Sequence, residues 1–201
     1  MARYTGPKNR INRKFGEAIL GSGKDLDKNS FPPGQHGNSK KRKTQSEYAI
    51  QLKEKQKAKY TYMVLEKQFR NTYVEAARLK GATGENLIKL LESRLDNTVF
   101  RMGLAPTRPA ARQLVGHKHL LINGEPVNIP SYRLKPGDTI ELKPKSKANT
   151  TVTGLVRPKN VKIGWVDFNE KEFKGTYLAH PERENVPENI REQLIVELYS
   201  K

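Results

Sequence analysis

The sequence contains no cysteine. It can therefore form neither a disulfide nor a thiolate metal site, which fits a protein of the reducing cytoplasm. It also has no long apolar span, signal peptide or lipidation motif, so we expect neither a membrane span nor a lipid anchor. Hydrophobic residues make up only 35% of the 201 residues. We therefore expect the burial of apolar side chains to be concentrated in part of the chain.

Acidic residues are scarce beside basic ones: 21 Asp and Glu stand against 38 Lys and Arg, a formal net charge of +17. The excess lies in two blocks, +10 over residues 1–59 and +9 over residues 94–162, whereas the block between them is nearly neutral and residues 166–201 carry −3. Such a charge attracts polyanions over a Debye length of about 8 Å in physiological salt. Nucleic acid is the leading partner, and an anionic membrane surface is the alternative.

Sequence patterns that mark catalytic sites are missing as well. There is no Gly-x-Ser-x-Gly turn to present a nucleophile, no Walker loop, and no Gly-x-Gly-x-x-Gly after a predicted strand. His117 and His119 have no third metal ligand nearby in the sequence. The segment 143–147 is similar to a synthetase loop, but no nucleotide-binding domain accompanies it. We therefore expect no enzyme, no cofactor and no metal ion.

The first 43 residues form a basic arm without a regular apolar period. Residues 31–37 contain two prolines and cannot continue a helix or a central strand, and the basic run Lys40–Lys43 follows. Two interpretations of the arm stay open. It is either a disordered basic tail or a segment that becomes ordered on RNA, where phosphate neutralisation offsets the lost chain entropy.

Helices are expected in the neutral block. Thr44 and Glu47 form a capping box, which predicts a helix that begins at Thr44. Apolar residues at helical spacing predict a second helix over residues 65–80, ended by Gly81, and Thr83 is placed to cap a third. We interpret this block as the core of a small helical domain.

Residues 91–142 are expected to form two short helices followed by a tight hairpin. Gly103 ends the first helix, and Thr107 is placed to cap the second. The pair Asn123-Gly124 between apolar runs predicts a type I′ hairpin with strands at 119–122 and 127–129. Further strands are expected at 139–142, 151–156 and 161–166, while residues 193–199 fit a strand or a helix equally.

Residues 91–142 resemble the S-four RNA-binding module. The matching positions are Arg94-Leu95-Asp96, Arg101, Thr107, Ala111-Arg112-Gln113, His117, Asn123-Gly124, Pro130-Ser131-Tyr132 and Gly137-Asp138. That module also occurs in tyrosyl-tRNA synthetases, pseudouridine synthases and small stress proteins, so the flanking segments decide between families. The segments 1–7, 32–37, 52–57, 66–71 and 192–200 all resemble bacterial small-subunit ribosomal protein S-four. The resemblance covers nearly the whole chain.

One departure from that family concerns metal binding. Many members carry four zinc-binding cysteines in the N-terminal arm, and the first two matching positions here are Asn9 and Asn12. Amide side chains do not rebuild such a site. We expect local packing and RNA to hold the arm instead. The segment 144–162 also matches the family poorly, so its register stays open.

The resemblance implies an α+β fold, in which an S-four module of two helices on a small, mostly antiparallel sheet is inserted into a small helical domain. The expected boundaries are 1–43 for the arm, 44–93 joined by 167–201 for the helical domain, and 94–166 for the module. It also implies a structural protein of the small ribosomal subunit in the cytoplasm. Such a protein binds a junction in the 5′ domain of 16S rRNA early in assembly and contributes to translational accuracy.

The resemblance further implies the small-subunit proteins S-five and S-three as neighbours, and a position where mRNA enters the subunit. Two other classes of function are kept as alternatives. One is an RNA-binding chaperone or stress factor that uses the module on any RNA. The other is the RNA anchor of a modifying enzyme, against which the missing catalytic domain argues.

Four arginines of the module are candidates for RNA contact. Spacings of seven and four residues place Arg94 with Arg101, and Arg108 with Arg112, on shared helix faces. An arginine fork suits phosphate and can stack on a base. The alternative is that some of these arginines pair with Asp96 or another carboxylate inside the fold.

The other candidates carry basic, amide, hydroxyl or aromatic side chains in the basic blocks and the module. Amides at the Thr107-capped helix start could receive a phosphate, and Tyr132 either stacks on a base or packs within the fold. In full, the predicted RNA-binding residues are Arg3, Lys8, Arg10, Arg13, Lys14, Gln35, His36, Lys40, Lys41, Arg42, Lys43, Tyr48, Lys53, Lys57, Gln68, Arg70, Arg94, Arg101, Thr107, Arg108, Arg112, Gln113, His117, Lys118, Asn123 and Tyr132.

Overall fold

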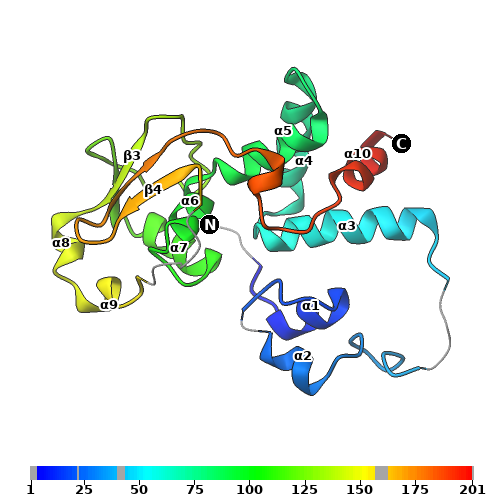
Figure 1. Cartoon of the computed structure of the whole chain (residues 1–201). Helices are drawn as coiled ribbons and strands as arrows, with labels where there is room; N and C mark the ends of the chain where they lie inside the picture. The colour runs from blue at the N-terminus through cyan, green and yellow to red at the C-terminus, as the bar shows by residue number, and fades with distance from the viewer. Residues whose placement is uncertain (1–3, 22, 40–43, 157–162, 201) are drawn as a thin grey trace. The chain divides into compact units, whose positions relative to one another are not determined.

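The computed structural model of the chain describes residues 4–21, 23–39, 44–156 and 163–200 (Figure 1). The chain forms two compact units. The first comprises residues 1–84 together with 188–201, and the second comprises residues 85–187. The expected α+β class is confirmed, because the second unit carries a five-stranded sheet beside its helices. No helix within the described residues is both long and apolar enough to span a membrane.

The first unit is helical. Its elements are α1 (Lys8–Phe15), α2 (Lys24–Lys28), α3 (Glu47–Thr61), α4 (Glu66–Arg78), the start of α5 (Thr83–Glu92), and α10 (Glu192–Ser200). The last of these packs along α3, with Ile195 fully buried. The buried Gln51 of α3 donates a hydrogen bond to Glu197 Oε2 at 2.9 Å. The segment 193–199, which fits a strand or a helix by sequence, is therefore a helix.

The helix α3 begins later than its sequence predicts. Its first residue is Glu47, and Ser46 is the cap, whose hydroxyl accepts a hydrogen bond from the Ala49 amide at 3.3 Å. The capping box predicted at Thr44 is therefore wrong. Thr44 and Ser46 both carry a hydroxyl group that can cap a helix. The sequence alone does not say which of the two is the cap.

Part of the N-terminal arm is folded. Ile11 and Phe15 of α1 lie in a small buried cluster with Leu20 and Met63, against which Tyr60 packs. The helix was not expected, because its own sequence supplies only two apolar residues. The remaining partners come from the following loop and from beyond the end of α3. Neither the tail nor the RNA-ordered interpretation included such a cluster.

Asn12 fastens the loop that follows α1. Its side chain is fully buried. The Nδ2 atom donates to the Leu20 carbonyl at 2.8 Å, and Oδ1 accepts from the Leu20 amide, also at 2.8 Å. The amide therefore closes the loop at one of the two positions that the sequence analysis matched to zinc-binding cysteines. The expectation that local packing holds the arm is confirmed for this segment.

The second unit contains the rest of α5, two helices that pack against each other, and the sheet. Its other elements are α6 (Leu95–Arg101), α7 (Arg108–Gly116), β1 (Leu120–Ile122), β2 (Glu125–Pro126), β3 (Thr139–Leu142), α8 (Pro144–Lys147), α9 (Thr150–Thr153), β4 (Val166–Asn169), β5 (Lys174–Tyr177) and the 3₁₀ turn η1 (Arg183–Asn185). The strand order is β2-β1-β3-β5-β4, and every pairing is antiparallel.

Close approach of β4 and α6 to the middle of the sheet requires a glycine. Gly175 of β5 pairs with Ile140 of β3, and a Cβ atom at this position would lie 2.6 Å from the Asp167 carbonyl oxygen of β4 and 2.8 Å from Cε of Met102, directly after α6. The Met102 side chain can move aside, but the backbone oxygen cannot, so any side chain at position 175 would disturb the pairing of β4 with β5. Figure 1 shows α6 and α7 beside the strands.

The hairpin turn agrees with its sequence. Asn123 and Gly124 both have positive φ, 50° and 86°, as a type I′ turn requires. The returning strand is β2 at 125–126, so the strand predicted at 127–129 was placed too late. Residues 151–156 do not form the predicted strand, because 150–153 belong to α9, which Asn149 caps. The strand expected at 161–166 falls partly outside the described residues, and β4 begins at Val166.

The two units differ from the expected domain boundaries in two places. Residues of the arm pack against the end of α3, so they belong to the helical unit. Residues 167–187, which we assigned to the helical domain, supply most of β4 and all of β5. These strands complete the sheet because β5 pairs with β3. The C-terminal helix does join the helical unit.

Candidate RNA interface

The helices α6 and α7 form the scaffold of the candidate interface. The hydroxyl of Thr107 accepts a hydrogen bond from the Ala110 amide at 3.3 Å, which confirms it as the cap of α7. Gly103, with φ of 80°, ends the preceding helix. These local signals fix where each helix begins and ends, and so fix which side chains share a face.

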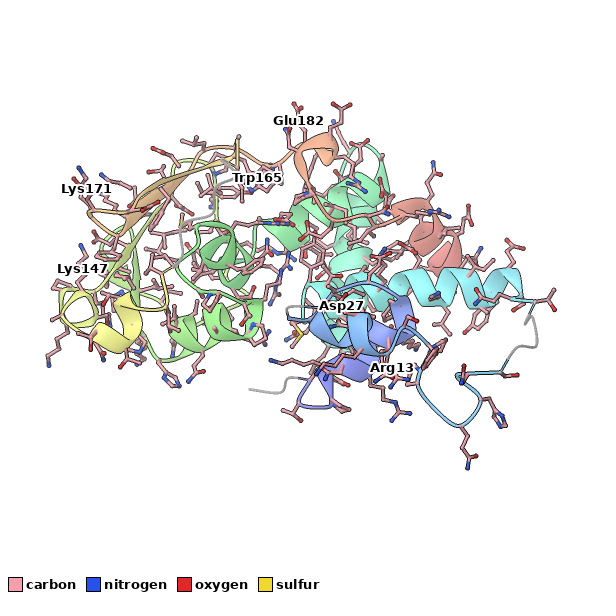
Figure 2. All side chains as sticks on the ribbon, turned by 60° about the horizontal axis from the view of Figure 1, so that its bottom comes forward. Arg13, Asp27, Lys147, Trp165, Lys171 and Glu182 are labelled. Carbon is pink, nitrogen blue, oxygen red and sulfur yellow. The ribbon has the colours of Figure 1, made fainter. Side chains whose placement is uncertain are left out.

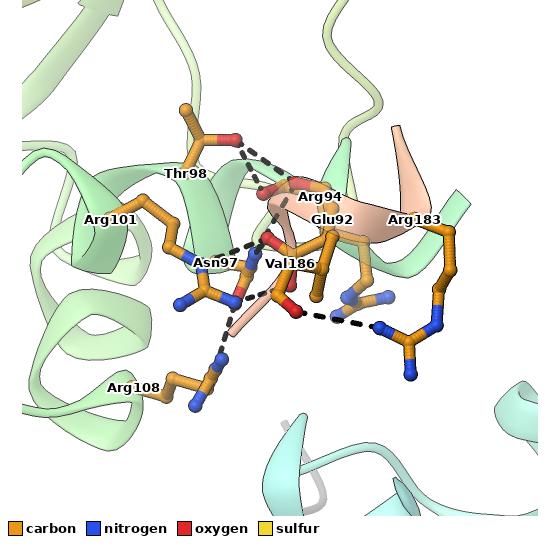
Figure 3. Close-up of polar contacts among 8 residues, drawn as sticks. All are labelled: Glu92, Arg94, Asn97, Thr98, Arg101, Arg108, Arg183 and Val186. Atoms are coloured by element: carbon orange, nitrogen blue, oxygen red, sulfur yellow. Dashed lines mark hydrogen bonds and ion pairs between the residues drawn. The ribbon is translucent and has the colours of Figure 1, made fainter. Parts of the chain in front are cut away.

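Glu92 is the centre of a buried polar cluster (Figure 3). It is fully buried at the end of α5 and accepts hydrogen bonds from Arg101 Nε at 2.9 Å and from Asn97 Nδ2 at 2.6 Å. Asn97 Oδ1 in turn accepts from Arg108 Nε at 2.7 Å. The Arg108 guanidinium also lies 4.5 Å from the centre of the Phe100 ring. A single carboxylate thus helps to position Arg108 through the asparagine between them.

Asp96 is the centre of a second cluster. Arg94 donates to it through Nε at 3.2 Å and Nη2 at 2.9 Å, a two-point contact. Arg112 of α7 reaches the same carboxylate at 3.4 Å. The side chains of Arg94, Asp96 and Arg112 are 7%, 7% and 10% exposed. This cluster therefore joins the two helices as well as placing Arg112.

These contacts divide the four arginines of the module by how far each is buried within the fold. Arg94 and Arg101 are buried in ion pairs with carboxylates of the fold. This is the alternative to RNA contact that the sequence left open. Arg112 is mostly covered but borders the surface. Arg108 is half-buried, and its contacts with Asn97 and Phe100 help to hold it in place. A guanidinium that is already positioned loses less freedom when it binds a phosphate.

The other predicted residues are placed as follows. The exposed ones are Lys8, Arg10, Lys14, Gln35, His36, Tyr48, Gln68, Arg70, Gln113, His117, Lys118, Asn123 and Tyr132. The half-buried ones are Arg13, Lys53, Thr107, Arg108 and Arg112. Arg3 and Lys40–Lys43 lie outside the described residues.

Three further residues predicted to contact RNA also have roles inside the fold. Lys57 is buried and pairs with Glu17 at 2.8 Å. Arg13 Nε donates to the Phe31 carbonyl at 2.9 Å and so holds the proline-containing loop. Asn123 bonds Asp138 and the Thr139 amide, each at 2.9 Å, which closes the hairpin turn. Their residue types suit RNA, but the intramolecular partners were not visible in the sequence.

His119 lies at the far end of α7, where Nδ1 is 2.9 Å from the Ser146 hydroxyl. Burial lowers its pKa below the ordinary value, and the neighbouring His117 and Lys143 lower it further. Within the described residues, no group of three or more His, Cys, Asp and Glu side chains could hold a metal ion.

The lowered pKa of His119 predicts a pH-dependent stability. On acidification the unfolded chain binds a proton near pH 6.5, before the folded chain does, so stability is lost as the pH falls below about 6.5. We expect His119→Gln to lose less unfolding free energy than the parent chain between about pH 7.5 and 5.5. Urea titrations at both pH values measure this, with His36→Gln as the control. Equal losses in the parent and His119→Gln would contradict the prediction.

Comparison with known proteins agrees with these features. Residues 3–92 match the model of the ribosomal protein S4/S9 N-terminal domain, and residues 93–140 match that of the S4 domain. Proteins named small ribosomal subunit protein uS4 match over 100% of both chains, with 60% identity in Bacteroides fragilis, 58% in Christiangramia forsetii and 57% in Cytophaga hutchinsonii. The chain belongs to the uS4 family. The family predicted from sequence is confirmed.

The two family models divide the chain near the polar clusters. The S4 domain match begins at residue 93 and includes α6, α7, the β1–β2 hairpin and the start of β3. Glu92 is the last residue of the N-terminal match, yet its carboxylate bonds Asn97 and Arg101 of the S4 domain. The carboxylate that orders the uS4 RNA-binding module therefore precedes the module in the chain.

Proposed function

We propose that this chain is a structural protein of the small ribosomal subunit, which binds the 5′ domain of 16S rRNA early in subunit assembly in the cytoplasm. Identity of 57–60% to uS4 proteins over the full chain carries the proposal. The family is one of structural ribosomal proteins, so the chain is not an enzyme. The chaperone and enzyme-anchor alternatives are not favoured.

The distribution of charge supports a two-step mechanism. The net charge of +17 attracts RNA at long range, where shape matters little. At short range, Arg108 and the α7 surface around it present groups that the Glu92 and Asp96 clusters have already positioned. Shape and 2′-hydroxyl contacts, rather than reading of bases in a deep major groove, then set specificity.

The binding test uses a 16S 5′-domain RNA and an equally long, structured control RNA across a salt series. If about eight phosphates are neutralised, log K against log salt should have a slope of about −6 to −7. A preference for the 5′ domain that survives high salt is the expected result. Equal affinities that fall together would reject the proposal and favour a general RNA chaperone.

We further propose S-five and S-three as neighbouring proteins and a position where mRNA enters the subunit. These proposals rest on the family resemblance alone. Cross-linking of assembled small subunits, followed by identification of the peptides joined to this chain, tests both protein neighbours. Absence of either neighbour from the cross-linked peptides would reject that assignment.

Arg108 offers a direct test of the module surface. We expect Arg108→Ala to weaken 5′-domain binding about 10- to 150-fold, because charge-assisted hydrogen bonds are worth about 1.5–3 kcal/mol, and to weaken control-RNA binding less. Lys171→Ala is the control variant, since Lys171 is exposed in the same unit between Glu170 and Glu172. Equal losses in the two variants would contradict a specific role for this surface.

A further inference from the structure

Beyond the arginines, the second unit carries a basic surface of which the sequence analysis assigned only His117 and Lys118 to RNA. It lies where the end of α7 meets α8, and we call it the lysine patch. Its members are His117, Lys118, Lys143, Lys145 and Lys147. The Lys143 amide donates to the His119 carbonyl at 2.9 Å, and the His119 ring is 2.9 Å from the Ser146 hydroxyl. These bonds fasten α8 to the segment after α7, and Figure 2 labels Lys147 at this end of the unit.

No acidic side chain neutralises the patch among the described residues. Residues 97–124 and 142–166 contain no Asp or Glu, and the described part of the chain shows no carboxylate within 4.0 Å of these four lysines. By contrast, Lys55 and Lys57 of the first unit are paired with Glu66 and Glu17. The ammonium groups of the patch therefore remain available to an external anion.

The backbone of Lys118 adds an independent argument. The Lys118 amide bonds the Val115 carbonyl at 3.0 Å, and the His119 amide bonds the Leu114 carbonyl at 3.1 Å. This is a Schellman motif, with Lys118 in the left-handed region at φ of 60°.

Glycine normally occupies that position, and α6 ends in this way at Gly103. A lysine there is disfavoured by its Cβ. Residues in strained backbone conformations cluster at functional sites, which agrees with a use for the exposed ammonium group of Lys118.

We propose that the lysine patch contacts phosphates of bound RNA and adds affinity without adding shape selection. The inference rests on the proposed RNA-binding function. Lysine ammoniums are flexible point charges, unlike the positioned guanidinium of Arg108. The nine-residue α7 is about 14 Å long, so Arg108 at its start and Lys118 beyond its end contact different phosphates. The patch contains none of the large exposed hydrophobic residues of the unit, which favours RNA over insertion into a membrane.

The first test uses two double variants of the full chain with equal net charge. Lys145→Gln/Lys147→Gln removes patch charges, and Lys171→Gln/Lys174→Gln removes exposed lysines from the acidic segment 166–201. We expect the patch variant to reduce the salt slope by about 1.4–1.8 for the 5′-domain and control RNAs alike, with the preference ratio unchanged. The control variant should keep the parent slope.

Equal slopes in the two double variants would overturn the proposal, and so would a lower preference ratio in the patch variant alone. Patch-dependent binding to phosphatidylserine vesicles that exceeds binding to RNA would assign the patch to a membrane instead. Failure of the proposed function itself is distinguishable, because the parent chain would then show no preference between the two RNAs.

The second test uses Lys118→Gly. Glycine relieves the left-handed backbone, so we expect the melting temperature to rise by a few degrees. We also expect the salt slope to fall by about 0.7–0.9, as the loss of one phosphate contact requires. A residue with only a structural role would change stability and leave the slope unaltered. An unchanged slope would therefore overturn the role of Lys118.

Discussion

Glu92→Ala is expected to lower the unfolding free energy of the second unit by about 3–5 kcal/mol. The carboxylate is fully buried and accepts hydrogen bonds from Arg101 and Asn97. Its removal leaves the Arg101 charge buried without its counter-charge. The single tryptophan, Trp165, is 3% exposed, and the centre of its ring lies 5.9 Å from Cζ of that guanidinium. Urea unfolding followed by its fluorescence therefore reports on this unit.

Two further variants separate the ion pair from general damage to α5. Glu85→Ala removes an exposed carboxylate that pairs with Lys89 at 3.7 Å, and should cost at most about 0.5 kcal/mol. Glu92→Met/Arg101→Met removes both buried charges and should recover most of the lost stability. If the double variant is as unstable as Glu92→Ala, an unpaired buried charge is not the cause of the stability lost in Glu92→Ala.

Asn12→Ala is expected to open the loop after α1, with a loss of about 2–6 kcal/mol of local stability. Both hydrogen bonds to Leu20 disappear, and its buried amide and carbonyl lose their partners at about 1–3 kcal/mol each. Hydrogen exchange at the Leu20 amide measures the opening. Asn9→Ala is the matched control, because Asn9 is an exposed residue of the same helix and should leave the exchange rate unchanged. Slow exchange in Asn12→Ala would contradict the role of the amide.

The parts of the fold that sequence predicted correctly depend on neighbouring residues. The Thr107 cap and the Asn123-Gly124 turn each involve a few consecutive residues, so the local sequence determines the conformation there. The incorrect predictions concern segments whose secondary structure depends on residues distant in the sequence. The helix α1 has only Ile11 and Phe15 of its own, and Met63 completes its cluster. Residues 150–153 are rich in threonine and valine, which favour strands, yet they form a helical turn after Asn149.

The candidate interface shows the same limit. Residue types and spacing located the α7 surface, and the resemblance named the family. They did not say which arginines the fold itself uses, because Arg101 depends on a carboxylate nine positions earlier that is oriented by a helix junction. Also missed in the sequence analysis were the three lysines of the patch that lie at and next to α8, Lys143, Lys145 and Lys147. Lys145 and Lys147 lie in a segment without a clear sequence pattern, and only the structure shows that their helix α8 is fastened to His119, shortly after α7.

The packing of α10 against α3 determines when each unit can fold during synthesis. Gln51 bonds Glu197, a residue made 146 positions later. The second unit is one continuous segment, 85–187, so it can fold as it leaves the translating ribosome. The first unit cannot be completed until the last helix emerges. The S4 module of a nascent chain can therefore engage RNA while α3 still exposes the surface that α10 will cover.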